Sequence, residues 1–344
     1  MVELLSFEDA LEMAGEGKRH LLLGNGFSIS LKPDIFTYGA LYDNADFSDI
    51  PYAEKLFEAL DTRDFEAVIR VLVDMARLLT VYKGASPALI KQIEADADKI
   101  KAILVDAIAS GHPDRPYDIE DDQYIACRAF LDHFSGGKIY TLNYDVLLYW
   151  ALMHEDVDEL DLLPDDGFRS DKDEPDAPYV TWQEAHKPTV YYLHGALHLF
   201  DAGHQLQKYT WSRTDLPIID QIREALDNNL YPLFVSEGHS HAKLTKIMHS
   251  AYLHKGLRSL ESVGGSLFIF GHSLAENDDH ILRLIETGKI AKLFVSIYGD
   301  PTTQANHAII QRAKGMAKNR HFHYGPRNRL DVFFYDAESA HVWG

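Results

Sequence analysis

The chain has 344 residues, of which 46% are hydrophobic and 25% charged, and its formal net charge is −20. These proportions are ordinary for a globular protein with a sizeable core, whereas the negative charge disfavours nucleic acid and anionic lipid as main partners. The single cysteine, Cys127, leaves no room for a disulfide framework or a four-cysteine zinc site. The N-terminus does not resemble a signal peptide and no apolar run has the length of a bilayer span, so we expect a cytoplasmic protein with no membrane partner.

Six short apolar runs predict strands that are covered on both faces. They lie at 21–24, 138–143, 190–194, 267–271, 293–298 and 332–335. Helical patterns alternate with them at 146–154, 244–260, 279–287 and 304–318. This alternation indicates an α/β fold with a doubly wound, mainly parallel six-stranded sheet of the Rossmann-like kind.

The long stretch between the first two strands has helical spacing of its apolar residues, clearest at 52–82, 90–108 and 122–134. We therefore predict a mainly helical insertion at 46–135. The nucleotide-binding domain would then consist of 1–45 and 136–344. The acidic segment 155–176 has no clear period and predicts an exposed loop.

Glycines follow the first strand directly, in the run Gly24-Asn25-Gly26-Phe27-Ser28. Glycines at the carboxyl end of a first parallel strand allow a tight turn and the close approach of a phosphate. The third glycine of the usual dinucleotide fingerprint is replaced by Ile29. A plain strand-to-helix turn therefore remains an equal alternative.

Polar residues follow the second and third strands. Asn143 and Asp145 come after the second, and His194 stands at the end of the third. Because open α/β sheets bind ligands at the carboxyl ends of their strands, these side chains are candidates for one crevice. The alternative is structural: Asp145 caps the next helix, Asn143 holds the turn, and His194 is a buried structural histidine.

The fourth strand ends in Gly271-His272-Ser273, and downstream Asn277, Asp278 and Asp279 are expected to form a helix cap. Small or polar residues at four consecutive strand ends form the pattern that a ligand crevice should have.

Histidines near His194 raise the question of a metal site. His198 and His204 lie close to it in the sequence. Gly195, however, weakens the helix on which His194 and His198 would share a face. We therefore expect no metal.

Taken in order, the motifs GNGFS (24–28), TLNYD (141–145), YYLHG (191–195) and GHSL (271–274) resemble the sirtuin-like NAD-binding superfamily. They are most similar to its divergent bacterial branch, whose members hydrolyse NAD, often in antiphage defence. The FTYGALYDNA stretch, the DFEAVI helix and the FYDA…VWG ending also resemble an uncharacterised bacterial family within that branch.

The resemblance implies which residues hold the dinucleotide. The turn that binds the pyrophosphate would comprise Gly24, Asn25, Gly26, Phe27 and Ser28. A second glycine motif would comprise Gly271, His272 and Ser273, in which His272 departs from the family pattern Gly-Thr-Ser. Asp336 falls where the last strand would meet the adenine.

The resemblance also implies the chemistry. Asn143 would sit by the nicotinamide ribose, Asp145 would read the carboxamide, and His194 would be the catalytic histidine. The expected function is hydrolysis of NAD to nicotinamide and ADP-ribose. A non-catalytic sensor of NAD or an ADP-ribose derivative is one alternative, and an ADP-ribosyl transferase or deacylase is another.

Two departures argue against protein deacylation: the missing cysteines, and Phe36-Thr37-Tyr38 in place of the sirtuin segment that has arginine after phenylalanine. The expected partner is a small-molecule nucleotide, and homo-oligomerisation is left open.

Overall fold

The structure, a computed structural model, describes residues 3–171, 174–203, 205–211, 213–227, 230, 232–236 and 238–344. All six predicted strands form one parallel sheet, in the order β11-β10-β9-β1-β2-β5. They are β1 (Arg19–Leu23), β2 (Ile139–Thr141), β5 (Val190–Tyr192), β9 (Gly264–Phe270), β10 (Lys289–Ile297) and β11 (Asp331–Asp336). The prediction of a doubly wound α/β fold with a parallel six-stranded sheet is confirmed.

The order of the strands locates a preferred place for a ligand. From β1 the chain adds β2 and β5 on one side, and then returns to add β9, β10 and β11 on the other. The direction of strand addition therefore reverses between β1 and β9. In open α/β sheets, ligands bind outside the carboxyl ends of the strands at such a reversal.

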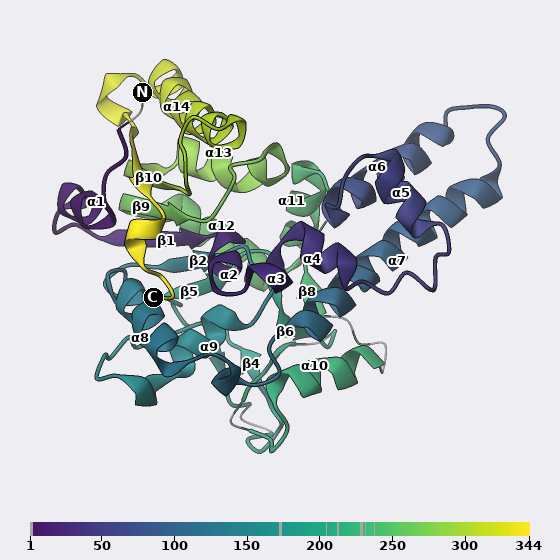
Figure 1. Cartoon of the computed structure of the whole chain (residues 1–344), viewed down its shortest axis with the longest axis horizontal. Coiled ribbons are helices and arrows are strands. Elements are labelled where there is room, and N and C mark those ends of the chain that lie inside the picture. The colour runs from purple at the N-terminus through teal and green to yellow at the C-terminus, as the bar shows by residue number, and fades with distance from the viewer. Residues whose placement is uncertain are drawn as a thin grey trace.

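A second sheet was not predicted. It is antiparallel, in the order β3-β4-β7-β6-β8, and its strands β4 and β6 lie below the parallel sheet in Figure 1. Its strands are β3 (Phe168–Arg169), β4 (Tyr179–Trp182), β6 (Gly195–Asp201), β7 (Leu206–Tyr209) and β8 (Pro232–Phe234).

The prediction that 155–176 is an exposed loop is wrong in part. The segment includes β3, in which Phe168 is buried. Asp158 accepts hydrogen bonds from the buried guanidinium of Arg128, at 2.8 and 3.1 Å. The sequence did not predict these two contacts, because a single buried apolar residue and a single ion pair give no periodic pattern in an acidic segment.

Helices account for the chain between β1 and β2. They are α2 (Gly26–Leu31), α3 (Pro33–Phe36), α4 (Tyr38–Asp43), α5 (Ala53–Ala59), α6 (Phe65–Leu79), α7 (Pro87–Gly111) and α8 (Asp121–Asp132). Figure 1 shows α5, α6 and α7 projecting to the right, away from the parallel sheet.

The remaining helices are α1 (Phe7–Ala14), α9 (Leu147–Met153), α10 (Ile218–Asp227), α11 (Ser240–His249), α12 (Ala251–Ser262), α13 (Asp279–Thr287) and α14 (Gln304–Tyr324). Short 3₁₀ turns lie at η1 (Pro116–Asp118), η2 (Glu155–Val157), η3 (Glu276–Asp278), η4 (Pro326–Asn328) and η5 (Glu338–Ala340). The single helix predicted at 244–260 is wrong: Ser250 is extended there and caps α12 by accepting a hydrogen bond from the Leu253 amide.

Helix α6 matters for the site because its first turn faces the body of the protein. Asp64 caps it by accepting hydrogen bonds from the Glu66 and Ala67 amides. The buried residues Phe65, Val68, Ile69, Leu72 and Ala76 recur at helical spacing and hold it in the core.

No helix in the described ranges is long and apolar enough to cross a membrane.

Candidate functional site

Two glycine turns meet backbone to backbone where β1 and β9 end. The Gly26 amide donates to the Gly271 carbonyl at 2.8 Å, and the Gly24 amide donates to Phe270 at 2.9 Å. A Cβ atom on Gly26 would lie 2.5 Å from the Gly271 Cα, and Gly271 itself has a φ of +67°. Glycine is therefore required at both positions by the contact between the turns, with or without a ligand.

The side chains of Asn25 and Phe27 fix the turn from the other side. Asn25 Nδ2 donates to the Phe36 carbonyl at 2.9 Å. Phe27 is fully buried, with its ring centroid 5.1 Å from that of Trp343, whose Nε1 donates to the Phe27 carbonyl at 2.9 Å. The C-terminal segment thus covers α2.

Ser28, Asn143 and Asp145 are joined by hydrogen bonds at the carboxyl edge. Ser28 Oγ donates to Asp145 Oδ2 at 2.5 Å, and Asn143 Nδ2 donates to Ser28 Oγ at 3.0 Å. Burial raises the pKa of Asp145. Asp145 Oδ1 also accepts from the Leu147 amide at the start of α9, at 3.0 Å, so the structural alternative of a helix-capping carboxylate has support as well.

The sheet register brings His194 to the same edge. Thr141 of β2 pairs with Tyr192 of β5, and Asn143 and His194 each follow two residues later. The chain then turns through Gly195 into the second sheet. A Cβ atom on Gly195 would lie 1.9 Å from the Leu233 carbonyl oxygen, and its φ is +79°, so only glycine lets the chain turn here.

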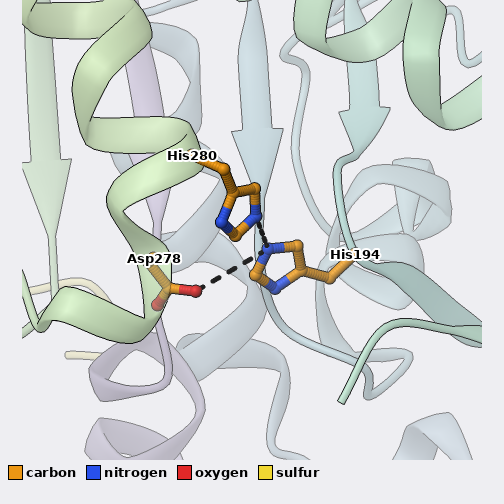
Figure 2. A group of neighbouring side chains, drawn as sticks. All are labelled: His194, Asp278 and His280. Carbon is orange, nitrogen blue, oxygen red and sulfur yellow. Dashed lines mark hydrogen bonds and ion pairs between the residues drawn. The ribbon is translucent and has the colours of Figure 1, made fainter. Parts of the chain in front are cut away.

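A buried polar cluster surrounds the His194 ring (Figure 2). His194 Nε2 lies 3.0 Å from His280 Nε2 and 3.8 Å from Asp278 Oδ1. His272 Nε2 lies 3.0 Å from the other oxygen of the same carboxylate, Asp278 Oδ2. Burial, aided by the nearby Lys243 ammonium, holds the pKa of His194 well below its usual value, so the ring is neutral at pH 7.

Lys243 ties this cluster to the helical insertion. Its Nζ donates to Glu66 Oε2 at 2.7 Å and to Asp278 Oδ1 at 3.1 Å, and its side chain is 1% exposed. Although burial opposes the charged form, the two carboxylates raise the pKa of Lys243. Burial likewise opposes ionisation of Asp278, but the His272 hydrogen bond and Lys243 hold its pKa well below the usual value. Lys243 and Asp278 are therefore both charged at pH 7.

Glu66 is held by further donors from the body of the protein. Tyr144 OH donates to Glu66 Oε1 at 2.9 Å, and Asn277 Nδ2 donates to Oε2 at 3.0 Å. Burial raises the pKa of Glu66. The first turn of α6 therefore forms part of the wall of the site.

The spacing of His194, Asp278 and His280 would suit a metal ion, because one ligand atom from each lies within 4.8 Å of the others. The Lys243 ammonium at 3.1 Å from Asp278 argues against it, since a dication and the ammonium would compete for one oxygen. His198 lies elsewhere, in β6, with its ring stacked on Tyr149 of α9, and His204 is outside the described residues. Absence of a metal remains a prediction.

Two predicted ligand residues make no hydrogen bond with the buried cluster in the part of the chain that the structure describes. Ser273 is exposed. Asp336 ends β11, with β10 and β9 between it and β1, and its Oδ1 accepts from the Glu338 amide at 3.1 Å.

Sequence reasoning missed Glu66, Lys243 and His280. The helix cap predicted at 277–279 is confirmed in position, because Asp278 is the N-cap residue of α13, but its side chain makes no capping bond and belongs to the cluster instead. One sequence signal pointed to Lys243, which lies four residues before Ile247 on the buried face of α11. A lysine on an apolar helix face implies a buried partner.

An open hollow of about 480 Å³ lies at the far end of α9 from Asp145. Its lining includes Arg115, Tyr117, His154 and Trp211, and none of the predicted site residues.

The fold and this strand edge define an α/β protein with a Rossmann-like parallel sheet and a buried polar cluster at its carboxyl end. The family model described as "Domain of unknown function (DUF4917)" matches residues 21–343, and the chain belongs to that family. Comparison with curated proteins finds no match.

Proposed function

We propose that this protein binds NAD at the carboxyl edge of β1, β2 and β5 and hydrolyses the nicotinamide–ribose bond. The observation that supports this best is the convergence of Ser28, Asn143 and Asp145, joined by hydrogen bonds, with His194 beside them in register. This place adjoins the reversal of strand order, where ligands of open α/β sheets bind.

The chemistry follows from the bond to be broken. Cleavage passes through an oxocarbenium-like ribose, and nicotinamide leaves as a neutral pyridine, so no general acid is needed. Asn143 would position the ribose and Asp145 the carboxamide. Water attacks the anomeric carbon as the C–N bond breaks, and His194 takes the proton that water loses. The carboxylate of Asp278 faces the His194 ring at 3.8 Å from Nε2 while the proton is taken up.

The candidate residues are closed off from solvent: Ser28, Asn143, Asp145 and His194 are exposed by 0%, 7%, 5% and 2%. NAD would therefore enter only when the covering segments separate. This burial is the observation that favours the alternative, an NAD sensor whose binding moves the cover without cleavage. An antiphage role accompanies the proposal on the strength of the resemblance alone, and a cytoplasmic location stays a prediction from the sequence.

The test is incubation of the purified protein with NAD, followed by chromatography for nicotinamide and ADP-ribose. We expect both products in equal amounts from the wild type. His194→Gln keeps a side chain that can hydrogen bond to His280, and Asn143→Ala removes the ribose contact. Each should lower turnover by about a hundredfold or more.

His307→Ala, at an exposed histidine on α14, is the matched control and should leave turnover unchanged. Melting temperatures on the same preparations separate loss of catalysis from loss of folding. A wild type that binds NAD and releases no nicotinamide would replace the enzyme with the sensor. Near wild-type turnover in either site variant would refute the assignment of that residue.

A further inference from the structure

The two nitrogens of the His194 ring have different surroundings. Nε2 is engaged by His280 Nε2 at 3.0 Å and faces Asp278 Oδ1 at 3.8 Å. Nδ1 lies on the side of the ring that faces away from His280 (Figure 2). Within the described ranges it has no hydrogen-bond partner, so Nδ1 is the nitrogen left for a substrate or water.

His280 also contacts a residue nearer the surface. His280 Nδ1 lies 3.2 Å from Ser240 Oγ, which also accepts from the His280 amide at 2.7 Å. Ser240, the first residue of α11, is only partly buried, whereas His280 and His194 are buried. Three polar groups therefore form a line from the buried edge outward.

Two opposite assignments of hydrogens satisfy every contact in this line, and a relay outward requires the one in which His194 donates. If His194 carries its proton on Nε2, it donates to His280 Nε2, and His280 then carries its proton on Nδ1 and donates to Ser240 Oγ. Ser240 Oγ accepts from the ring and the amide, and its own hydrogen is free to point to solvent. In this arrangement His194 Nδ1 is a bare acceptor.

We propose that His194, His280 and Ser240 form a proton relay, with His280 and Ser240 as positioning residues that pass on the proton His194 removes during hydrolysis. The proposal rests on the proposed function. Water gives its oxygen to the ribose and one proton to His194 Nδ1. The Nε2 proton of His194 moves to His280 Nε2, the Nδ1 proton of His280 moves to Ser240 Oγ, and Ser240 releases its own proton to solvent. One proton enters the chain of groups and one leaves.

The surroundings explain why a relay is needed. His194 is faced by Lys243 from α11, Asp278 from η3, His280 from α13 and His272 from the turn after β9. Burial keeps its pKa low, and Asp278 is already engaged by Lys243 and His272. An imidazolium formed here would not persist. The His280 ring, in contact with His194 Nε2, lets the positive charge move outward instead of remaining on His194.

Kinetics of His280 variants test the relay. His280→Ala should lower kcat for nicotinamide release about a hundredfold with little change in KM. Free imidazole should restore part of this loss. The related compound 1-methylimidazole should not restore activity. One of its nitrogens is methylated, so the ring can accept a proton but cannot donate one from the other side. Ser240→Ala should also slow turnover, and Ser240→Thr should retain it.

His20→Gln is the matched control, a buried histidine at the amino end of the sheet, and should leave kcat unchanged. Rescue of His280→Ala by both ring compounds alike would mean that His280 only fills space, and would overturn the relay. So would wild-type kcat in His280→Ala.

Nitrogen NMR of ¹⁵N-histidine-labelled wild type, assigned with the His194→Gln and His280→Ala variants, gives a readout independent of NAD. We expect the proton on Nε2 in His194 and on Nδ1 in His280. The opposite pair of tautomers would overturn the relay even in an active enzyme. A wild type that releases no nicotinamide would instead refute the proposed function, and the tautomers would still decide the hydrogen-bond arrangement.

Discussion

Lys243→Met is the change that most directly tests whether the insertion is joined to the sheet through buried charge. Lys243 is 1% exposed and pairs with two carboxylates that are each 13% exposed, those of Glu66 and Asp278. Methionine fills a similar volume, so packing changes little. The substitution leaves both carboxylates without their shared ammonium.

The magnitude follows from the cost of an unpaired buried charge. Removing one partner of a buried ion pair typically costs about 3–5 kcal/mol. The Tyr144 and Asn277 hydrogen bonds to Glu66, and the His272 hydrogen bond to Asp278, remain and partly compensate. We therefore expect a loss of about 3 kcal/mol in the free energy of unfolding, at the lower end of that range.

Urea unfolding at pH 7, followed by circular dichroism, measures this loss. Lys318→Met on α14 removes an exposed lysine and should change the free energy of unfolding by less than about 0.5 kcal/mol. Adding Glu66→Gln to Lys243→Met removes one of the two uncompensated carboxylates and should recover part of the loss. A Lys243→Met protein as stable as the Lys318→Met control would refute the view that a buried ion triad joins α6 to α11.

Three further predictions follow from the same structure. Burial lowers the pKa of His20 and of His112 to about 4, so the folded state binds fewer protons than the unfolded state between about pH 6.5 and 4. The free energy of unfolding should therefore fall as pH drops through this window, by up to about 1.4 kcal/mol per pH unit for each histidine. Equal urea midpoints at pH 7 and pH 5 would contradict this. Gly26→Ala should destabilise the fold by about 1–3 kcal/mol, because the new Cβ atom would lie 2.5 Å from the Gly271 Cα. Gly315→Ala, in open space on α14, should stabilise the fold by about 0.5–1 kcal/mol. Urea unfolding of the two variants measures these opposite changes. Elemental analysis of the purified protein should find no stoichiometric zinc, and one zinc per chain that is lost in His194→Gln would show that the cluster is a metal site.

The parallel sheet was predictable because burial on both faces leaves a continuous apolar run in the sequence. Leu21, Leu22 and Leu23 are each fully buried in β1, as the run itself indicates. The second sheet gave no such signal. Its strand β7 reads Leu-Gln-Lys-Tyr, in which Lys208 is buried through an ion pair with Asp166.

The strand-end residues of the site were predictable for a related reason. Parallel strands end at one edge, so Asn143 and His194 had to lie close once β2 and β5 were neighbours. Glu66 and Lys243 were not predictable, because their contact joins residues 177 apart in sequence. No local pattern in either helix specifies the other as its partner.

The structure of the His194→Gln variant in complex with NAD would show where the substrate binds, because this variant should hold NAD without turnover. We expect the nicotinamide ribose against Asn143 and residue 194, with the carboxamide at Asp145 and the pyrophosphate beside the turn from Gly24 to Ser28. NAD bound instead in the hollow lined by Trp211 and Tyr117, or no binding at millimolar NAD, would contradict it.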